Sequence, residues 1–321
     1  DLNSSYAHSS LELPALHAQI ADDTTIEWCI VSATINENTG MVVSRIHKHR
    51  PDIIAATNWL FNHEQLLHII SRAKALLPHC CIVLGGPEFL GNNEAFLYKN
   101  KFVSGVFRGE GEEVFPQWLK VWNHSKETWK SITGLCYLDE NGRYQDNGIA
   151  RVMNFSQLVS PEKSCFFNWS KPFVQLETTR GCFNTCAFCV SGGEKPVRTI
   201  PLEAIRERLN DIHQHGIKNV RVLDRTFNYN NKRAKELLDL FRQYPDICFH
   251  LEIHPALLSE ELKQELSVLP KGLLHLEAGI QSLKESVLQQ SHRIGKLSDA
   301  LEGLKYLCSL KNMETHADLI A

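Results

Sequence analysis

The chain has 321 residues, which corresponds to roughly two domains of about 150 residues each. With 43% hydrophobic and 22% charged residues, its composition excludes wholesale disorder, a collagen repeat and a coiled-coil rod. The 34 Lys+Arg and 37 Asp+Glu residues give a formal charge of -3, which favours neither a nucleic-acid nor a membrane partner. Apolar runs such as residues 80–84 are far shorter than the roughly 20 residues that cross a bilayer. We therefore expect a soluble, cytoplasmic protein.

The chain contains ten cysteines. It is too long for a small disulfide-stabilised scaffold and has no recognisable signal peptide, so we expect reduced thiols or metal ligands. It opens at Asp1 without a methionine and closes inside residues 318–321, an apolar run that looks like the beginning of a strand. We expect a fragment of a longer protein, truncated at its C-terminus.

Strand and helix patterns alternate over residues 1–125. Apolar runs with strand character lie at 28–31, 52–56, 80–84 and 103–107. Between them, residues 64–77 carry apolar side chains at helical spacing. This alternation predicts a doubly wound α/β domain, in which helices cover both faces of a parallel sheet. The polar opening, residues 1–10, fits a loop after a first strand that this chain lacks.

Residues 126–170 break this rhythm. Two extended segments flank an Asn141-Gly142 turn, and Asn-Gly between such runs is a strong hairpin signal. We expect a linker that carries a small β-hairpin.

The alternation resumes over residues 171–321. The pattern predicts strands at 173–177, 220–223, 248–253 and 273–279, with a fifth beginning at 316. The intervening helices are expected at 201–215, 232–244, 259–269 and 298–310. Repeated strand-helix units predict an open or complete (β/α) barrel, and such folds place their chemistry at the carboxyl ends of the strands.

Three cysteines, Cys182, Cys186 and Cys189, lie within eight residues just after the first of these strands. One given three-cysteine spacing is expected by chance on the order of 0.01 times in such a chain. A structural zinc ion normally takes four ligands, and no second Cys-x-x-Cys pair follows at finger spacing. An iron–sulfur cluster also takes four thiolates, so three cysteines leave one iron open to a ligand that is not protein.

This spacing, with Phe188 just before the last cysteine and a strand before the loop, resembles the radical S-adenosylmethionine (SAM) superfamily. The resemblance implies a 4Fe-4S cluster whose open iron is chelated by the amino and carboxylate groups of SAM. It further implies that an electron from the cluster cleaves SAM to methionine and a 5'-deoxyadenosyl radical, which abstracts hydrogen from the substrate. A barrel mouth covered by loops suits this chemistry because it excludes water and oxygen.

Two short motifs match known cofactor motifs but lie in the wrong places. Residues 192–194, Gly-Gly-Glu, spell the motif that contacts the SAM amino group in this superfamily, but there it follows the second strand. Residues 211–216 match the Asp-x-His-x-x-Gly pattern of many cobalamin domains. They end an amphipathic helix, where Gly216 fits a left-handed stop and histidines are favourable. We interpret both matches as coincidences.

Contacts to SAM are expected where the later strands end, as in related enzymes. The candidates are Asp224, Arg225, Glu252, Glu277, Gln281 and Ser282. Acceptors such as Glu252 suit ribose hydroxyls, although Glu252 also fits a cap of the next turn. Asp224 equally fits a helix cap or a loop turn. Arg293 could approach a carboxylate, but we interpret it as a solvated arginine at a helix end.

Three loops of the first domain carry candidate ligand contacts. They contain Ser9 and Ser10, Gly85-Gly86-Pro87, and Gly109-Glu110-Gly111. Glycine lets backbone approach a ligand closely, but the same residues also make simple tight turns.

Together with the cysteine loop, the segments 6–11, 83–88, 108–112 and 222–228 resemble an uncharacterised branch of the cobalamin-dependent radical SAM enzymes. The resemblance covers nearly all of the chain. It implies a Rossmann-like cobalamin-binding domain at residues 1–125. This domain has no Asp-x-His-x-x-Gly motif, so bound cobalamin would lack a histidine below cobalt or would use His8.

The sequence therefore predicts three parts: a cobalamin-binding domain at 1–125, a hairpin linker at 126–170 and a truncated radical SAM barrel at 171–321. The expected activity is a radical reaction at an unreactive carbon, with methyl transfer from methylcobalamin ahead of ring formation or rearrangement. The expected partners are a small-molecule substrate and an external low-potential electron donor. Two alternatives stay open: a first domain that binds no cobalamin and recognises substrate, or a non-enzymatic zinc or electron-transfer protein.

Overall fold

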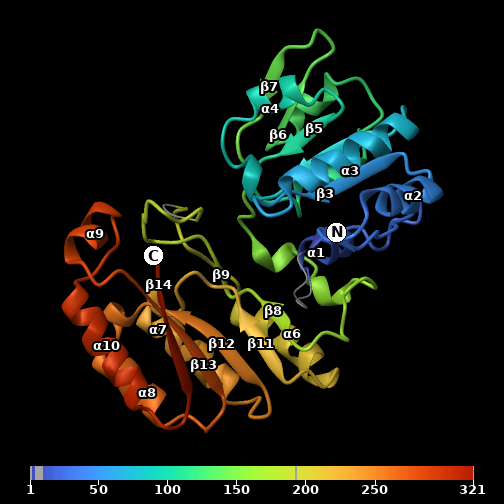
Figure 1. The fold of residues 1–321 in the computed structure, drawn as a ribbon. Coiled ribbons are helices and arrows are strands. Elements are labelled where there is room, and N and C mark those ends of the chain that lie inside the picture. The colour runs from blue at the N-terminus through green and yellow to red at the C-terminus, as the bar shows by residue number, and fades with distance from the viewer. Residues whose placement is uncertain (1, 4–9, 192–193, 321) are drawn as a thin grey trace. The chain divides into compact units, whose positions relative to one another are not determined.

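The computed structural model describes residues 2–3, 10–191 and 194–320 (Figure 1). The chain divides into two compact units, Asp1–Phe167 and Asn168–Ala321, called unit 1 and unit 2 below. None of the described helices is long and apolar enough to cross a lipid bilayer.

Unit 1 is built on a five-stranded sheet with the order β3-β4-β5-β6-β7. Its strands are β3 (Ile53–Thr57), β4 (Cys81–Gly85), β5 (Gly105–Phe107), β6 (Leu135–Leu138) and β7 (Tyr144–Asp146). The first three strands pair in parallel, whereas the last two pair antiparallel, so the sheet is mixed rather than parallel throughout.

The expected hairpin is present, but it is part of this sheet. Strand β6 pairs with β5, and β7 pairs with β6. The segment that we expected to form a linker therefore belongs to unit 1. The physical reason is that β5 offers an unpaired edge, and an antiparallel hairpin satisfies the backbone hydrogen bonds of that edge.

Helices cover both faces of the unit 1 sheet, as predicted. The helices are α1 (Glu12–Ala18), α2 (Thr39–His49), α3 (His63–Leu76), α4 (Glu94–Lys99) and α5 (Val114–Leu119). Short 3-10 turns are η1 (Pro87–Phe89), η2 (Thr128–Ser131), η3 (Phe155–Gln157) and η4 (Pro161–Lys163). Ile82 and Leu84 of β4 enter one core with α2 and α3, whereas Val83 enters a second core with α5. Successive strand residues point to opposite faces, so both cores follow from one buried strand.

The beginning of unit 1 differs from expectation in two ways. Residues 2–3 form a strand, β1 (Leu2–Asn3), where we expected only a loop, and it pairs in parallel with β2 (Ala33–Thr34). Residues 28–31 form no strand. Trp28 instead packs its ring edge-on against Phe115 and His17, at centroid distances of 6.1 and 5.4 Å. The Trp28 ring is therefore packed against neighbouring rings although its backbone forms no strand.

Unit 2 is an open, parallel five-stranded sheet with the order β14-β13-β12-β11-β8. Its strands are β8 (Val174–Leu176), β11 (Asn219–Val222), β12 (Cys248–Ile253), β13 (Leu274–Gln281) and β14 (Glu314–Leu319). The main helices are α6 (Leu202–Gln214), α7 (Asn231–Phe241), α8 (Glu260–Ser267), α9 (Glu285–Gln290) and α10 (Leu297–Ser309), with turns η5 (Phe227–Tyr229) and η6 (Pro255–Leu257). The strands add in chain order, which confirms the partial (β/α) barrel (Figure 1).

The two faces of this sheet differ in chemistry. Burial alternates strictly along β12 and β13. Apolar side chains such as Phe249 are buried beneath the helices, and Phe249 stacks on Phe241 of α7 at 4.0 Å. The alternate residues, including His250 and Glu277, are half-buried on the opposite, inner face. In a barrel, that face carries the side chains that point inward.

The cysteine loop leaves the sheet after β8 and is closed at its base. Strands β9 (Thr179–Arg180) and β10 (Arg198–Thr199) pair antiparallel on either side of it. Gly181 has φ +94°, and a Cβ there would lie 2.5 Å from the Glu194 carbonyl oxygen. The Cys182 amide donates to that oxygen at 2.9 Å, so glycine lets the two arms of the loop meet.

The buried side chain of Asp224 anchors the start of this loop. One carboxylate oxygen accepts hydrogen bonds from the amides of Thr178 (2.8 Å) and Thr179 (2.9 Å). The other oxygen accepts from the Thr178 hydroxyl. Asp224 follows β11 and the two threonines follow β8, so this contact fixes the loop between two neighbouring strands.

We predict that Asp224→Ala destabilises unit 2 and lowers the iron content of the reconstituted protein. Each buried amide left without an acceptor costs about 1–3 kcal/mol, so the free energy of unfolding should fall by at least about 2 kcal/mol. Urea denaturation and iron analysis measure the two effects. Asp224→Asn keeps an acceptor for both amides and should recover most of the loss. Equal behaviour of the two variants would contradict the anchoring role.

Candidate functional site

A polar pocket lies where strands β11 to β14 end. It is lined by Arg225, Thr226, Glu252, Ile253, His254, Glu277, Gly279, Gln281, Arg293 and Asp318. Four of these were sequence candidates: Arg225, Glu252, Glu277 and Gln281. Because the strands run in parallel, their carboxyl ends meet at one edge, and residues far apart in the chain converge there.

The three cysteines lie together on one loop. Cys182 and Cys186 are buried, whereas Cys189 is exposed. Burial raises the pKa of the Cys182 thiol, and the neighbouring thiols of Cys189 and Cys186 raise it further. Two groups oppose these effects and lower this pKa: a backbone hydrogen bond at Asn184 and the charge of Arg225. The three thiols are thus close enough to interact electrostatically.

A single metal ion and a larger cluster require different spacings of the sulfur atoms. Thiolates around one zinc ion lie roughly 3.8 Å apart, given Zn–S bonds of about 2.3 Å. Among the described residues, the three cysteines do not form a group whose ligand atoms all lie within 4.8 Å. A 4Fe-4S cluster does not require the thiolates to approach so closely, because each thiolate binds a different iron.

A segment after α9 holds the cysteine loop beside the pocket. The Ala187 amide donates to the Ser291 carbonyl at 2.9 Å, and the Ile294 amide donates to the Asn184 side chain at 3.3 Å. Between these contacts lies Arg293, whose guanidinium is 4.0 Å from Cys186 Sγ and donates to the Gly279 carbonyl at 2.5 Å. We expected Arg293 to be solvated, and the structure corrects this: it links the cysteines to the pocket.

Gly279 makes room for the side chains at the end of β13. A Cβ at this position would lie 2.4 Å from the Gln281 amide nitrogen and 3.3 Å from an Arg293 guanidinium nitrogen. Gln281 itself has φ +70°, which is a strained conformation for a residue other than glycine. The missing side chain at Gly279 thus leaves room for Gln281 and Arg293, which both line the pocket.

Two carboxyl groups of the pocket, Glu277 and Asp318, influence each other's pKa. Burial opposes ionisation of Glu277, but hydrogen bonds from Asp318 and His250, together with the charge of Arg221, outweigh it and lower the Glu277 pKa. The hydrogen bond to Glu277 raises the pKa of Asp318. The two carboxyl groups thus shift each other's pKa in opposite directions.

The pocket contains both cationic and anionic side chains. Desolvation and the charge of Glu277 raise the pKa of Glu252, whereas Arg225 and Arg221 lower it. Arg225 and Arg293 supply cationic donors that suit a carboxylate. Glu252 and Glu277 supply acceptors that suit hydroxyl or ammonium groups. A zwitterionic ligand with hydroxyl groups is the class of molecule that this set of side chains can bind.

Three other candidates of unit 2 lie outside the pocket lining. Asp224 is buried behind the cysteine loop, as described above. Ser282 lies in the bend after β13, where its hydroxyl accepts from the Lys284 amide at 3.2 Å. Phe188 is exposed on the cysteine loop.

Of the two discounted motifs, residues 192–193 lie outside the described residues. Gly216, with φ +73°, follows α6 as the expected helix stop.

The candidate loops of unit 1 follow strands β4 and β5. Gly86 has φ +108°, and a Cβ there would lie 2.5 Å from the Asn58 carbonyl oxygen. Gly109 has φ +104°, and its Cβ would lie 2.2 Å from the Ala150 carbonyl oxygen. Both glycines are thus required by close contacts within the chain. Ser9 lies outside the described residues, and the Ser10 hydroxyl donates to the Glu12 carboxylate.

The other residues of these loops also have partners within unit 1. The Glu110 carboxylate accepts from the Val152 amide at 2.7 Å. The Gly111 carbonyl accepts from the Phe115 amide at 2.8 Å. Gly85 is the last residue of β4, and Pro87 is the first residue of η1. These residues shape the edge of the sheet at which a doubly wound domain binds its ligand.

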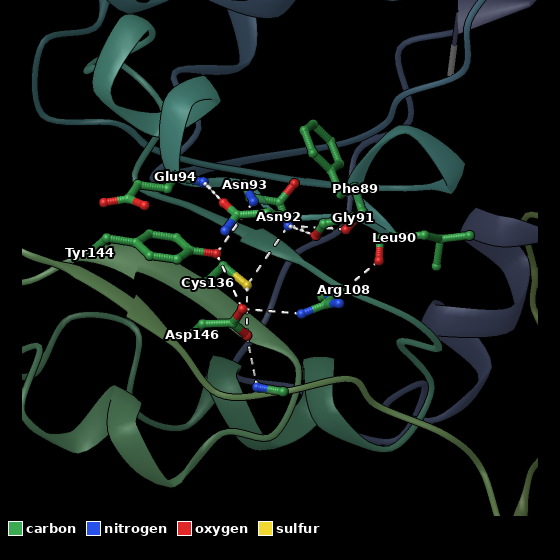
Figure 2. Close-up of polar contacts among 11 residues, drawn as sticks. Phe89, Leu90, Gly91, Asn92, Asn93, Glu94, Arg108, Cys136, Tyr144 and Asp146 are labelled. Carbon is green, nitrogen blue, oxygen red and sulfur yellow. Dashed lines mark hydrogen bonds and ion pairs between the residues drawn. The ribbon is translucent and has the colours of Figure 1, made fainter.

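The β6–β7 hairpin ties the two loops together (Figure 2). Arg108 donates to the Leu90 carbonyl and to the Asp146 carboxylate, both at 3.0 Å. The Cys136 thiol donates to Asp146 at 3.6 Å and accepts from the Asn93 side chain at 3.8 Å. Burial is the main cause that raises the pKa of Cys136, so this thiol is held in its neutral form. The loops after β4 and β5 are therefore anchored to one polar network.

The loop after β3 is the most apolar surface at this edge. Trp59, Leu60 and Phe61 follow β3 directly and are 36%, 82% and 47% exposed. An exposed apolar cluster of this kind suits a large, flat, largely apolar ligand.

Among the described residues of the three loops, 58–62, 86–93 and 108–113, none is a histidine. His8, the alternative ligand, lies outside the described residues.

His254 gives the pocket a testable pH response. Its ring is buried, and both ring nitrogens lack a partner among the described residues. Desolvation is the main cause that lowers its pKa from 6.5 to about 4, and the charge of Arg293 adds to the effect. The unfolded chain therefore takes up a proton near pH 6.5 that the folded chain does not. The stability linked to His254 is present above pH 6.5 and is lost as the pH falls towards 4.

We predict that replacing His254 with leucine flattens this pH dependence. At about 1.36 kcal/mol per pKa unit, the wild-type free energy of unfolding should lose about 2–3 kcal/mol through His254 between pH 7 and pH 4.5. Urea denaturation at both pH values measures the loss, and the difference between wild type and His254→Leu isolates it from carboxylate titrations. The exposed His68 provides the control, because His68→Leu should keep the wild-type slope. A parallel response of His254→Leu and wild type would refute the prediction.

Comparison with known proteins identifies both units. Residues 4–119 match the B12 binding domain, and residues 176–316 match the radical SAM superfamily. The chain is 29% identical over 201 residues to "Uncharacterized methyltransferase PH0819" of Pyrococcus horikoshii, covering 60% of this chain and 43% of that protein. The chain thus spans less than half the length of this relative.

Two solved structures share the fold. The cobalamin-dependent SAM radical enzyme OxsB, with aqua-cobalamin and SAM bound, has a TM-score of 0.77 at 17% identity, over 97% of this chain and 46% of OxsB. The radical SAM methyltransferase TsrM of Kitasatospora setae, with cobalamin and a [4Fe-4S] cluster bound, has a TM-score of 0.74 at 15% identity, over 99% of this chain and 68% of TsrM. With a B12 binding domain followed by a radical SAM domain, the chain belongs to the cobalamin-dependent radical SAM family, whose cofactors are a 4Fe-4S cluster, SAM and cobalamin.

Proposed function

We propose that the protein to which this chain belongs is a cobalamin-dependent radical SAM methyltransferase that acts on an unreactive carbon of a small molecule. The observation that carries the proposal is the position of the three cysteines beside a pocket with paired arginines and carboxylates. Ring formation or rearrangement is the alternative outcome of the same radical chemistry.

In this proposal Cys182, Cys186 and Cys189 hold the cluster, and the pocket binds SAM. When bound, the reduced cluster supplies the electron that cleaves the sulfonium of SAM, and cobalamin supplies the methyl group. Arg293 touches both the cysteine loop and the pocket, so it is suited to bind the SAM carboxylate. Glu252 and Glu277 accept hydrogen bonds from the ribose hydroxyls or the ammonium group. Asp224 is a positioning residue that acts through the loop.

The proposed cobalamin site lies at the carboxyl ends of β3, β4 and β5. The exposed side chains of Trp59, Leu60 and Phe61 form its apolar surface. The anchored backbone around Gly86 and Gly109 forms its rigid border.

The proposal includes two partners and a compartment. An external low-potential donor supplies the electron, and the substrate is a small molecule. Ten free thiols, three of them proposed cluster ligands, favour a reducing compartment such as the cytoplasm.

We predict that Cys186→Ala abolishes SAM cleavage, because the cluster loses one of three protein ligands. After anaerobic reconstitution, SAM cleavage is measured as 5'-deoxyadenosine formed in the presence of dithionite. Iron and sulfide analysis of the same samples should give about four irons per chain for wild type and far fewer for the variant. Cys165→Ala is the matched control, because Cys165 is an exposed thiol of unit 1. Retained cleavage in Cys186→Ala, or zinc in place of iron in wild type, would overturn the proposed site.

We predict that the chain binds cobalamin and that Leu60→Asp weakens this binding roughly tenfold. Covering a leucine side chain with a bound ligand contributes up to about 1.5–3 kcal/mol of apolar contact, which the substitution removes. A loss of about 1.4 kcal/mol corresponds to a factor of ten in affinity. Spectral titration with hydroxocobalamin measures the affinity. Leu76→Asp is the control, since Leu76 is an exposed apolar residue at the last position of the 14-residue helix α3, roughly 20 Å along the helix from the loop. No spectral change with wild type would favour a first domain that recognises substrate instead.

A further inference from the structure

Three potential metal ligands converge on the inner face of the unit 2 sheet. His250 of β12, Glu277 of β13 and His316 of β14 each place one ligand atom within 4.8 Å of the other two. They are the only group of three such ligands among the described residues. None of them belongs to the cysteine loop.

Strand register brings these side chains together. Glu277 is paired with His316 across β13 and β14. His250 is paired with His275, which lies two residues before Glu277 on the same face. Because three neighbouring strands supply one ligand each, the backbone itself fixes the convergence. Sites on strands hold ligands more accurately than sites on loops.

The distances fit a small metal ion. His250 Nε2 lies 2.9 Å and His316 Nε2 lies 3.7 Å from the same carboxylate oxygen of Glu277, Oε2. Ligands around a tetrahedral zinc ion lie roughly 3.3–3.6 Å apart, given bonds of about 2.0–2.2 Å. The observed distances lie on either side of this range, so small side-chain adjustments complete the site. We propose that His250, Glu277 and His316 bind a divalent transition-metal ion of the Zn²⁺ class.

The chemistry of the neighbours supports the site. His316 Nδ1 lies 2.9 Å from His275 Nε2, and this hydrogen bond orients the ring so that Nε2 faces Glu277. Metal-binding histidines commonly have such a partner on the other ring nitrogen. Desolvation is the largest cause that lowers the pKa of His250, so its imidazole is neutral, as a metal ligand must be. Two histidines and one carboxylate leave further coordination positions open.

Arg221 provides the competing explanation. Its guanidinium lies 3.1 Å from Glu277 Oε2, so the cluster can also exist as a hydrogen-bonded network without metal. The same guanidinium lies 3.9 Å from Glu252, which is a second carboxylate partner if Glu277 binds a cation. The site goes beyond the proposed function and shares Glu277 with the proposed SAM pocket, so when metal is bound the contact to the ribose or ammonium group falls to Glu252. It is tested without SAM or cobalamin, so a failure of either proposal does not imply a failure of the other.

The experiment measures zinc in the full chain after cluster reconstitution, so that iron occupies the cysteines. Wild type is incubated with Zn²⁺, dialysed and analysed for zinc and iron. We expect about one zinc per chain, with nitrogen and oxygen ligands in X-ray absorption at the zinc edge. His316→Ala should lose this zinc and keep its iron. His275→Ala should weaken zinc binding roughly 10–100-fold, because it removes the partner that orients His316.

Two controls make the result decisive. His124→Ala removes an exposed histidine of unit 1 and should keep the zinc. A full chain with alanine at all three loop cysteines should still bind zinc, because the proposed ligands contain no sulfur. The proposal is overturned if wild type retains no zinc, if His316→Ala retains it, or if the absorption spectrum shows sulfur ligands. In each of those cases Arg221 and the histidines form a hydrogen-bonded network only.

Discussion

The buried carboxylate of Asp224 is the interaction on which the candidate site depends. It binds two amides and one hydroxyl from the residues that follow β8, although it belongs to the end of β11. Burial alone raises the pKa of Asp224, and the hydrogen bonds from Thr178 and Thr179 lower it. The donors offset part of this rise, and the pKa of Asp224 stays raised because burial is the largest cause. The β9–β10 pair and the segment around Arg293 build on this fixed starting point.

The inner face of the unit 2 sheet explains why one pocket contains both cations and carboxylates. Alternation along β12 and β13 assigns apolar residues to the helix-covered face and leaves polar residues on the other face. Charges crowded on this face are tolerated because they are paired: Glu277 contacts both Arg221 and His250. Such a face is costly to desolvate unless a ligand or metal completes the pairing. The polar pocket and the histidine cluster are two consequences of the same alternation.

Sequence pattern predicted the elements of unit 2 well because each signal is local. The limits of β12 match the expected range, and the helices differ by a few residues at their ends. Arg293 was interpreted as solvated, and His254 and Asp318 were missed, because no local signal marks the contacts of these residues. Arg293 reaches the cysteines only because the segment after α9 returns to the loop. Asp318 reaches the pocket only through its register with Gly279 on β13. A reading based on strand ends alone finds some pocket residues, but not those that distant segments contribute.

Unit 1 shows a different limit, because one sequence signal fits two physical causes. Glycine with positive φ is expected both where a ligand approaches the backbone and where two loops pack closely. At Gly86 and Gly109 the nearby atoms are the carbonyl oxygens of Asn58 and Ala150, so contacts within the chain already require glycine. These glycines therefore give no separate evidence for a ligand. The stronger argument is the exposed apolar run that begins at Trp59, because folding leaves it uncovered within unit 1. In the proposed cobalamin site, affinity should thus depend on the apolar loop after β3, and the glycine loops should act by holding their part of the edge rigid.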